Sequence, residues 1–412
     1  MPTSNHDAII IGAGAAGLMA AIHAAERGRR VLLLEKGRKP GVKILMSGGT
    51  RCNITHDCDA RGIVTAFGSN GKFLHSALAA FGPRETVAFF ESEGVATKVE
   101  DTGKVFPVSD RAMDVLDALL RRLRRSGAQL YLNEPAREIF WHPDTGFRIV
   151  TSSRTLVARK VLITTGGRSY PGCGTTGDGY AWAASFGHTI VPPRPALVPI
   201  TVHAPWVTEL RGITLPDIKL AVVTPEGQAL ASRRGSLLFA HFGLTGPVAL
   251  DVSRAVSSHA QAKTLMLELD LLPTIPESDL DAFLRTASLV SGKKQLAVIL
   301  AEKIPRRLAD HLLFQCGLSV DRKGAALSKP DRHKLVMVIK RLRLRVCGTL
   351  GFEKAEVTAG GVSLDEVDSR TMQSKNQPGL YLAGEVLDLD GWIGGYNFQA
   401  AWSTGWLAGR EL

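Results

Sequence analysis

The chain has 412 residues, enough for two or three domains, and 45% of them are hydrophobic, as in an ordinary globular protein. Its five cysteines are scattered, odd in number and without a CxxC pair, which excludes a disulfide framework and a zinc-finger spacing. We therefore expect a reducing, cytoplasmic environment and identify no targeting segment. The net charge of +11 suits nucleic acid, membrane or acidic partners without choosing among them.

Residues 7–36 predict a strand, a glycine turn, a helix and a second strand. Ala8–Ile11 is a continuous apolar run that suits a strand buried in a parallel sheet. The G-x-G-x-x-G turn that follows permits a tight bend, a close approach of phosphates and close packing of helix on strand. The N–H groups at the start of the helix can then face a pyrophosphate. The residues expected there are Gly12, Gly14, Ala15, Ala16 and Gly17.

Glu35 ends the second strand, Val31–Leu34, at the distance from Gly12 where a ribose-binding carboxylate is expected, with Lys36 beside it. A carboxylate there accepts hydrogen bonds from ribose hydroxyls and repels a 2′-phosphate. The alternative to a dinucleotide-binding segment is a membrane span, because Ala8–Ala25 contains no Asp, Glu, Lys or Arg. The three glycines and the alanine-rich filler favour the dinucleotide interpretation.

The next part of the chain begins with a long Gly-rich loop at 41–56, and helices are expected at 84–93 and 111–125. Residues 128–165 alternate as short strands. The last of these strands emerges into a second glycine turn, Thr165, Gly166 and Gly167, which would bring the chain back to the nucleotide.

Two proline clusters, at 192–199 and 273–276, mark domain boundaries. The pattern of short strands between them predicts a β-domain, and the pattern of residues 277–345 predicts a helical insert. The insert has 15 Lys and Arg against 7 Asp and Glu, a net charge of +8. We therefore predict a nested organisation. It comprises a nucleotide-binding domain at 1–193 and 371–412, a β-domain at 194–276 and 346–370, and the insert at 277–345.

The last segment, residues 379–409, predicts a strand, a Gly-rich turn and a closing helix. It resembles the segment that completes the flavin site in flavoproteins with two dinucleotide folds. Gly384 and Glu385 form its Gly-acid pair, and the closing helix opens with Gly394, Gly395, Tyr396 and Asn397. If the two ends of the chain meet, its first and last segments hold one cofactor between them.

Seven strings, in order over residues 6–409, together resemble the BaiN-like or aminoacetone-oxidase-like family of FAD-dependent flavoproteins. They are Ser47–Thr55, Thr165–Gly167 with Ser169–Pro171, Gly174–Gly179, Phe239–Pro247, Thr358–Val362, Thr371–Lys375 and Gly394–Asn397. The family more often has Gly, Asn and Glu where this chain has Thr50, His56 and Gln373. The resemblance implies an α/β fold and non-covalent FAD. The implied parts are a glutathione-reductase-like, Rossmann-type FAD domain, an inserted β-barrel-like domain and a small helical domain.

FAD requires further contacts beyond the pyrophosphate and ribose. Ala136, within residues 135–137, is the candidate for the adenine edge, and Gly384 with Glu385 is the candidate for the ribityl chain. The N–H groups that open the closing helix would face the flavin pyrimidine ring and stabilise charge on it. The Gly-rich loop contacts FAD or is a structural turn. Its candidate residues are Gly48, Gly49, Arg51, Cys52 and Asn53.

No catalytic residue is assigned, and no metal site is expected. His241 is a general acid/base candidate or a structural histidine. Tyr170 and Tyr396 are proton donors or packing residues. Cys52 has no second cysteine at a dithiol spacing, which weighs against a redox role.

The leading hypothesis is an FAD-dependent oxidoreductase that transfers a hydride between a small organic substrate and flavin N5. Oxygen or NAD(P)H is the other redox partner, and the single complete G-x-G-x-x-G predicts that a nicotinamide visits only transiently. The alternative is a flavin-containing RNA-modifying or nucleic-acid-binding protein, suggested by the basic insert. The insert has few aromatic residues, Phe283 and Phe314, so we rank nucleic acid below a small molecule. No membrane partner is expected.

Overall fold

The computed structural model describes residues 6–412, so residues 1–5, with which the predicted nucleotide-binding domain begins, lie outside the described part. The chain forms two compact units. One contains Met1–Pro195 and Glu356–Leu412, and the other contains Ala196–Ala355. Among residues 6–412, no helix has both the length and the apolar character needed to cross a membrane.

The main sheet of the first unit has a parallel centre in the order β6-β2-β1-β9. β18 pairs with the second half of β9, and antiparallel β8 and β7 extend the sheet from its first half. The central strands are apolar and buried, as expected for a parallel sheet covered on both faces. This confirms the Rossmann-type fold. The strands are β1 (His6–Ile11), β2 (Val31–Leu34), β6 (Gln129–Tyr131), β7 (Ala136–His142), β8 (Gly146–Thr151), β9 (Thr155–Ile163) and β18 (Leu380–Leu382).

Helices and two small sheets complete the first unit. The expected helices at 84–93 and 111–125 are confirmed as α5 and α6. The expected loop at 41–56 instead begins with a helix, α2, which kinks at Ser47. The helices are α1 (Ala15–Glu26), α2 (Val42–Thr50), α3 (Ala60–Ala66), α4 (His75–Ala80), α5 (Pro83–Ser92), α6 (Ala112–Ser126), α7 (Asp178–Ser185) and α14 (Tyr396–Glu411). The small sheets are β3 (Thr55–His56), β5 (Lys104–Pro107) and β4 (Thr97–Val99), and β10 (Ile190–Ala196) with β17 (Val357–Val362).

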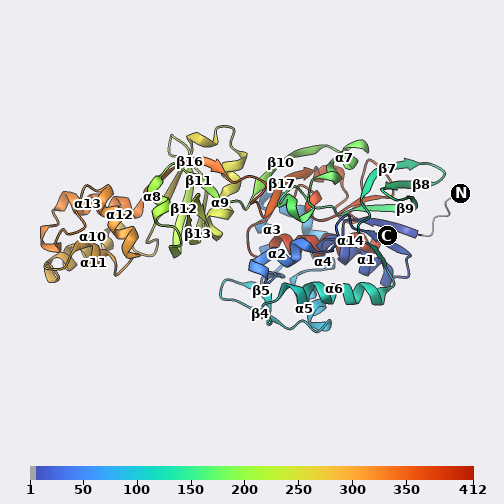
Figure 1. Ribbon diagram of the computed structural model, residues 1–412, viewed down its shortest axis with the longest axis horizontal. Helices are drawn as coiled ribbons and strands as arrows, with labels where there is room; N and C mark the ends of the chain where they lie inside the picture. The colour runs from blue at the N-terminus through green and yellow to red at the C-terminus, as the bar shows by residue number, and fades with distance from the viewer. Residues whose placement is uncertain (1–5) are drawn as a thin grey trace. The chain divides into compact units, whose positions relative to one another are not determined.

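The two ends of the chain meet, because α14 packs along α1 (Figure 1). A Cβ atom on Gly405 would lie 2.3 Å from the carbonyl oxygen of Ala16, and one on Gly409 would lie 2.6 Å from that of Ala20. These two positions of α14 therefore admit only glycine at the observed spacing. The expectation that the first and last segments come together is confirmed.

The second unit contains a closed barrel in the order β11-β14-β13-β12-β15-β16. Along β16, buried Leu342, Leu344 and Val346 alternate with exposed Arg343 and Arg345, the two-residue period of a strand with one apolar face. The barrel strands are β11 (Ile200–Val202), β12 (Thr214–Val223), β13 (Ala229–Ala240), β14 (Gly243–Thr245), β15 (Met266–Asp270) and β16 (Leu342–Thr349). Helices α8 (Pro205–Glu209) and α9 (Pro247–Ser258) pack on it.

A helical insert lies between β15 and β16 and shares one hydrophobic core with the barrel. Its helices are α10 (Glu277–Val290), α11 (Leu296–Leu300), α12 (Arg306–Gln315) and α13 (Lys329–Lys340). The inserted barrel and the helical part match the predicted fold class. The finer division into three domains remains our proposal, and the compact units place residues 356–370 with the first unit.

The contact between α1 and α14 predicts a specific pH dependence. His23 stacks on Trp406 with ring centroids 3.7 Å apart, and burial together with nearby Arg27 lowers the pKa of His23 to about 4. In the unfolded chain His23 therefore binds a proton below about pH 6.5, whereas in the folded chain it binds one only below about pH 4. The stability contributed by neutral His23 is complete above that window and is lost as the pH falls through it.

His23→Phe keeps a stacked ring and removes the titration. Its free energy of unfolding, measured with urea between pH 7 and pH 4, should fall less than that of the wild type. His75→Phe, at an exposed position, is the control and should follow the wild-type curve. Parallel curves for wild type and His23→Phe would contradict the assignment.

Candidate functional site

The glycine turn between β1 and α1 forms an open cradle. Gly12 has a φ of +105°, and a Cβ atom on Gly17 would lie 1.9 Å from the Gly12 carbonyl oxygen, so both positions require glycine. A Cβ atom on Gly14, by contrast, would meet no protein atom within 4 Å. No side chain caps the N-terminus of α1, and its first turn has no acidic residue. The N–H groups of Ala15, Ala16 and their neighbours are therefore available to an anion.

Glu35 lies at the end of β2 and is tied to this turn. Its carboxylate accepts hydrogen bonds from the backbone N–H groups of Ala13 (3.0 Å) and Gly37 (2.7 Å). The chain leading into β7 runs alongside, because Glu134 N donates to Glu35 O at 3.0 Å, and Ala136 follows two residues later. Lys36 instead binds Thr176 and Asp178, each at 2.6 Å. The structure therefore brings Glu35 and the 134–136 segment together and directs Lys36 to the loop before α7.

The second glycine turn follows β9 and lies beside the first. Thr164 Oγ1 donates to Ile11 O and Gly12 O, and a Cβ atom on Gly12 would lie 3.1 Å from the Cα atom of Thr165. Gly166 has a φ of +73°. Gly384 also reaches this place, because a Cβ atom on it would lie 2.9 Å from the Cβ atom of Ala16. Three segments far apart in the sequence therefore converge on the start of α1.

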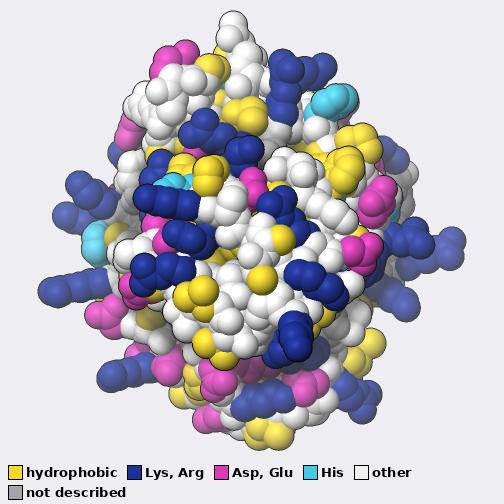
Figure 2. Space-filling model, turned by 90° about the vertical axis from the view of Figure 1, so that its left-hand side faces the viewer, with side chains coloured by type: hydrophobic (Ala, Val, Ile, Leu, Met, Phe, Trp, Pro, Cys, Tyr) yellow, Lys and Arg dark blue, Asp and Glu magenta, His cyan; other side chains and the backbone are white. Residues whose placement is uncertain are grey.

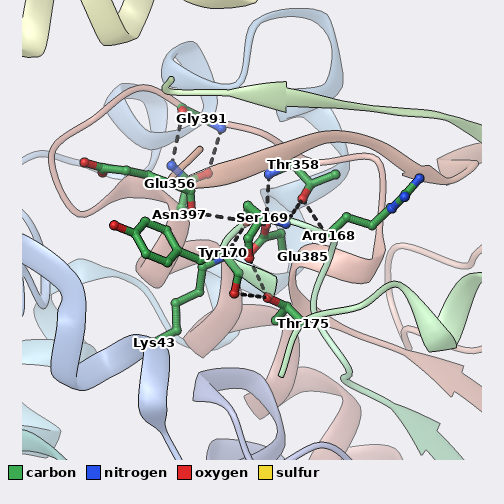
Figure 3. Close-up of polar contacts among 10 residues, drawn as sticks. All are labelled: Lys43, Arg168, Ser169, Tyr170, Thr175, Glu356, Thr358, Glu385, Gly391 and Asn397. Carbon is green, nitrogen blue, oxygen red and sulfur yellow. Dashed lines mark hydrogen bonds and ion pairs between the residues drawn. The ribbon is translucent and has the colours of Figure 1, made fainter. Parts of the chain in front are cut away.

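Glu385 is held by a network of polar contacts (Figure 3). Its Oε1 accepts from Ser169 Oγ at 2.9 Å and from Thr358 N at 2.9 Å. Its Oε2 forms an ion pair with Lys43 Nζ at 2.7 Å, and the same Nζ lies 2.7 Å from Ser169 Oγ. A Cβ atom on Gly167 would lie 2.3 Å from Thr358 Oγ1, so the chain passes too close there for any other residue. Glu385 is therefore a fixed, half-buried carboxylate with a cation beside it.

The Gly-rich segment at the kinked end of α2 turns through four residues with positive φ, namely Gly48, Gly49, Thr50 and Cys52. Arg51 points to the β4–β5 hairpin, where it pairs with Glu100 at 2.7 Å and its guanidinium lies over the Phe106 ring. Cys52 is fully buried, and burial raises the pKa of its thiol to about 12. A thiol in this state is protonated at neutral pH, so it lacks the thiolate that a redox role requires.

The start of α14 is joined to this loop. With the amide orientation that satisfies both groups, the Asn53 side chain accepts from Gly395 N at 3.0 Å and donates to Thr55 O at 2.9 Å. Asn397 closes the turn before α14 through Gly391 N at 2.8 Å and Gly391 O at 3.1 Å. Gly394 and Gly395 both have positive φ, and Tyr396 follows them, almost fully buried. The helix therefore begins in a fixed position.

His56, which departs from the family pattern, and the acid/base candidates His241 and Tyr170 differ in their surroundings. His56 bonds the Gly394 carbonyl oxygen through Nδ1 at 3.0 Å and stacks on Tyr396. His241, in the other unit, is exposed and stands edge-on to Phe242. Tyr170 has a φ of +55° and a ψ of +62°, a left-handed conformation that is costly for an aromatic residue. Thr175 Oγ1 donates to the carbonyl oxygens of Ser169 and Tyr170 and holds that conformation.

These features fit FAD. The space beside Gly14 and the uncapped start of α1 suit a pyrophosphate. Within the part of the chain that the structure describes, Thr165 Oγ1 and Tyr180 OH are buried without a hydrogen-bond partner, and both are donors that a bound polar group can use. The sequence analysis did not identify Lys43, because a lysine in an expected loop carries no signal of its own. Thr358 and Ser169 lay within family strings, but no role was assigned to them.

Fold and site together define a flavoprotein oxidoreductase with FAD in a Rossmann-type domain. The family model "HI0933-like protein Rossmann domain" matches residues 6–411, so the chain belongs to the HI0933-like Rossmann family. It is 37% identical over 409 residues to a "Ribosomal RNA dihydrouridine synthase" of Escherichia coli, covering 98% of both chains. It is 33% identical over 404 residues to a "3-dehydro-bile acid delta(4,6)-reductase" of Clostridium scindens, covering 97% of both.

A solved structure supports the fold alone. The 3-ketosteroid-delta4-(5alpha)-dehydrogenase of Rhodococcus jostii aligns with a TM-score of 0.52 and 14% identity, covering 100% of this chain and 97% of that chain. The family and the relatives confirm the expected FAD-dependent oxidoreductase and its cofactor. The individual site residues named above remain our proposal.

The open space at Gly14 predicts a variant that folds without its cofactor. Val is compatible with the φ of −82° and ψ of −167° at this position, and its Cβ atom would meet no protein atom within 4 Å. Gly14→Val should therefore keep the wild-type melting behaviour of the apoprotein and retain no FAD, because the side chain occupies the pyrophosphate volume. Flavin absorbance per protein after gel filtration is the measurement. Gly235→Val, in a barrel strand where a Cβ atom would lie an ordinary 4.0 Å from the Cβ atom of Val248, is the control and should stay yellow.

Proposed function

We propose that this protein is an FAD-dependent reductase that converts uridine in ribosomal RNA to dihydrouridine. The observation that carries the proposal is the 37% identity to a ribosomal RNA dihydrouridine synthase over 98% of both chains. The net charge of +11 supports it, because a basic protein attracts a polyanionic substrate. The proposal places the RNA-modifying alternative of the sequence analysis ahead of a small-molecule substrate.

The two relatives' names describe one kind of chemistry. Dihydrouridine is uridine with the double bond between carbons 5 and 6 of uracil reduced, and that bond is conjugated to a carbonyl group. The name of the 3-dehydro-bile acid delta(4,6)-reductase describes reduction of double bonds that are conjugated to a 3-keto group. We therefore infer reduction of a carbon–carbon double bond conjugated to a carbonyl as the reaction of this site.

The reaction balances with one hydride and one proton. Bound FAD supplies the hydride chemistry at one carbon of the double bond, with NADH or NADPH as the electron source and NAD(P)⁺ as its product. The other carbon needs a proton from a group of the protein or from water. In this proposal Gly12–Gly17 hold the pyrophosphate, Glu35 holds the ribose, and Glu385 fixes the ribityl chain.

The strained Tyr170 is our candidate for the proton donor. Backbone strain of this kind persists where surrounding contacts enforce it, and it is concentrated at functional sites. Here Thr175 and Ser169, which also bonds Glu385, enforce it. Tyr170 also follows directly after Ser169, which bonds Glu385, so the Tyr170 backbone adjoins the polar network around that carboxylate. We assign to Oη the proton that the second carbon receives.

Tyr170→Phe separates the two half-reactions. Reduction of the flavin by NAD(P)H should proceed as in the wild type, while oxidation of the reduced flavin by the substrate should slow about 10²- to 10⁴-fold, the range for loss of a general acid. Anaerobic stopped-flow absorbance follows both steps. Tyr131→Phe, at the end of β6, is the control with the same change. Wild-type rates in both steps would remove Tyr170 from the mechanism.

A small conjugated ketone is the second candidate substrate, favoured by the 33% identity to the bile acid reductase. The deciding experiment reduces the protein with NADPH or NADH without oxygen and then adds substrate. The two substrates are ribosomal RNA transcribed in vitro, which carries no dihydrouridine, and a 4-en-3-one steroid. Reoxidation by the RNA, with dihydrouridine found by nucleoside mass spectrometry, is the expected result. Reoxidation by the steroid alone would contradict our proposal and support the second candidate.

A further inference from the structure

The helical insert at 277–345 uses most of its acidic side chains internally. Five of the seven pair with a Lys or Arg of the same insert. These pairs are Glu277–Arg341, Asp281–Arg332, Glu302–Lys294, Asp310–Arg306 and Asp331–Arg322. Because the cations outnumber the acids by eight, such pairing leaves unneutralised positive charge on the surface.

Part of this surplus gathers around one short bridge. Gln295 and Lys323 form an antiparallel bridge, extended by hydrogen bonds from Gly324 N to Lys294 O and from Ala325 N to Gly292 O. The start of α12 joins them, because an Arg306 guanidinium nitrogen lies 3.5 Å from Gln295 Oε1. The structure thus brings three segments of the insert to one place. We call the five exposed cations here the basic patch: Lys293, Lys294, Arg306, Arg307 and Lys323.

Three members of the basic patch are unpaired. Lys294 and Arg306 have carboxylate partners, whereas Lys293, Arg307 and Lys323 form no ion pair with any residue in the range 6–412. Leu289 and Val290, four and three residues before Lys293, are 80% and 81% exposed. Figure 2 views the molecule from the side on which Figure 1 draws the insert, and Lys and Arg side chains are spread across that face. One exposed carboxylate lies at the same place, because Gln295 Nε2 donates to Asp321 Oδ1 at 2.9 Å. The five cations outnumber it, so the patch is cationic on balance, with exposed apolar residues close by in the sequence.

We propose that the basic patch docks the phosphate backbone of an RNA substrate, an inference that rests on the proposed function. An enzyme that acts on one nucleotide of a large folded RNA needs contacts outside the site, and backbone phosphates supply the positioning ones. Unpaired lysine and arginine side chains provide such contacts, and exposed apolar side chains beside them can cover a base or sugar. An anionic membrane surface is the competing occupant that the test must exclude.

The test replaces the three unpaired cations, as Lys293→Gln, Arg307→Gln and Lys323→Gln together. The matched control is Arg84→Gln, Arg124→Gln and Arg148→Gln, which lowers the net charge equally at exposed positions of the first unit. Binding of transcribed ribosomal RNA to the FAD-loaded protein is measured by filter retention over a range of salt concentrations. The patch variant should bind on the order of 100-fold more weakly at 0.1 M salt, with a shallower salt dependence, while the control changes little.

Other readouts keep the result interpretable. FAD content, melting temperature and flavin reduction by NAD(P)H should be unchanged in the patch variant, which excludes a folding defect. Equal RNA affinity of wild type, patch variant and control would overturn the docking inference, even if the wild type forms dihydrouridine. Patch-dependent binding to vesicles of phosphatidylcholine and phosphatidylserine, without RNA binding, would overturn it in favour of a membrane. Patch-dependent RNA binding without dihydrouridine formation would support the docking inference and reject the proposed function.

Discussion

The site depends on the close packing of the last helix against the first. Gly405 and Gly409 let α14 approach the backbone of α1 at Ala16 and Ala20, a distance that a Cβ atom would prevent. Because α1 also begins the phosphate cradle, the position of α14 determines where Gly384 and the Gly394–Gly395 turn lie relative to it. We therefore propose that the cofactor site is assembled by a contact between residues almost four hundred positions apart, rather than within a single βαβ unit.

The electrostatic arrangement of the site differs at its two ends. At the start of α1, backbone N–H groups and the helix dipole present partial positive charge without a side-chain cation, which suits a phosphate that must approach closely. At Glu385, a carboxylate is neutralised by Lys43 and fixed by Ser169 and Thr358. The pairing avoids an uncompensated charge at this half-buried carboxylate, which we propose as the acceptor for the ribityl chain. The strained Tyr170 adjoins this same network.

Under our proposed function, the insertion separates two requirements that a reductase of a large substrate must meet. The first unit contains the proposed FAD site, where Glu385 is fixed by hydrogen bonds and an ion pair. The helical insert carries the surplus positive charge, and in our proposal its unpaired cations Lys293, Arg307 and Lys323 contact the phosphates of the RNA. Acidic partners within the insert stabilise its helices and at the same time set which cations remain unpaired. The same ion pairs therefore stabilise the insert and determine which of its cations stay unpaired.

The sequence by itself determined the parts of the site whose information is local. The glycine turn, the acid Glu35 and the closing helix follow from spacing and hydrophobic period, because a turn or a buried strand depends on neighbouring residues. The tertiary structure decided the rest. Lys43 meets Glu385 across 342 positions, Lys36 turns to Asp178, and Arg51 is paired with Glu100. The partner of a charged side chain is set by the packing of distant segments, which no local pattern records.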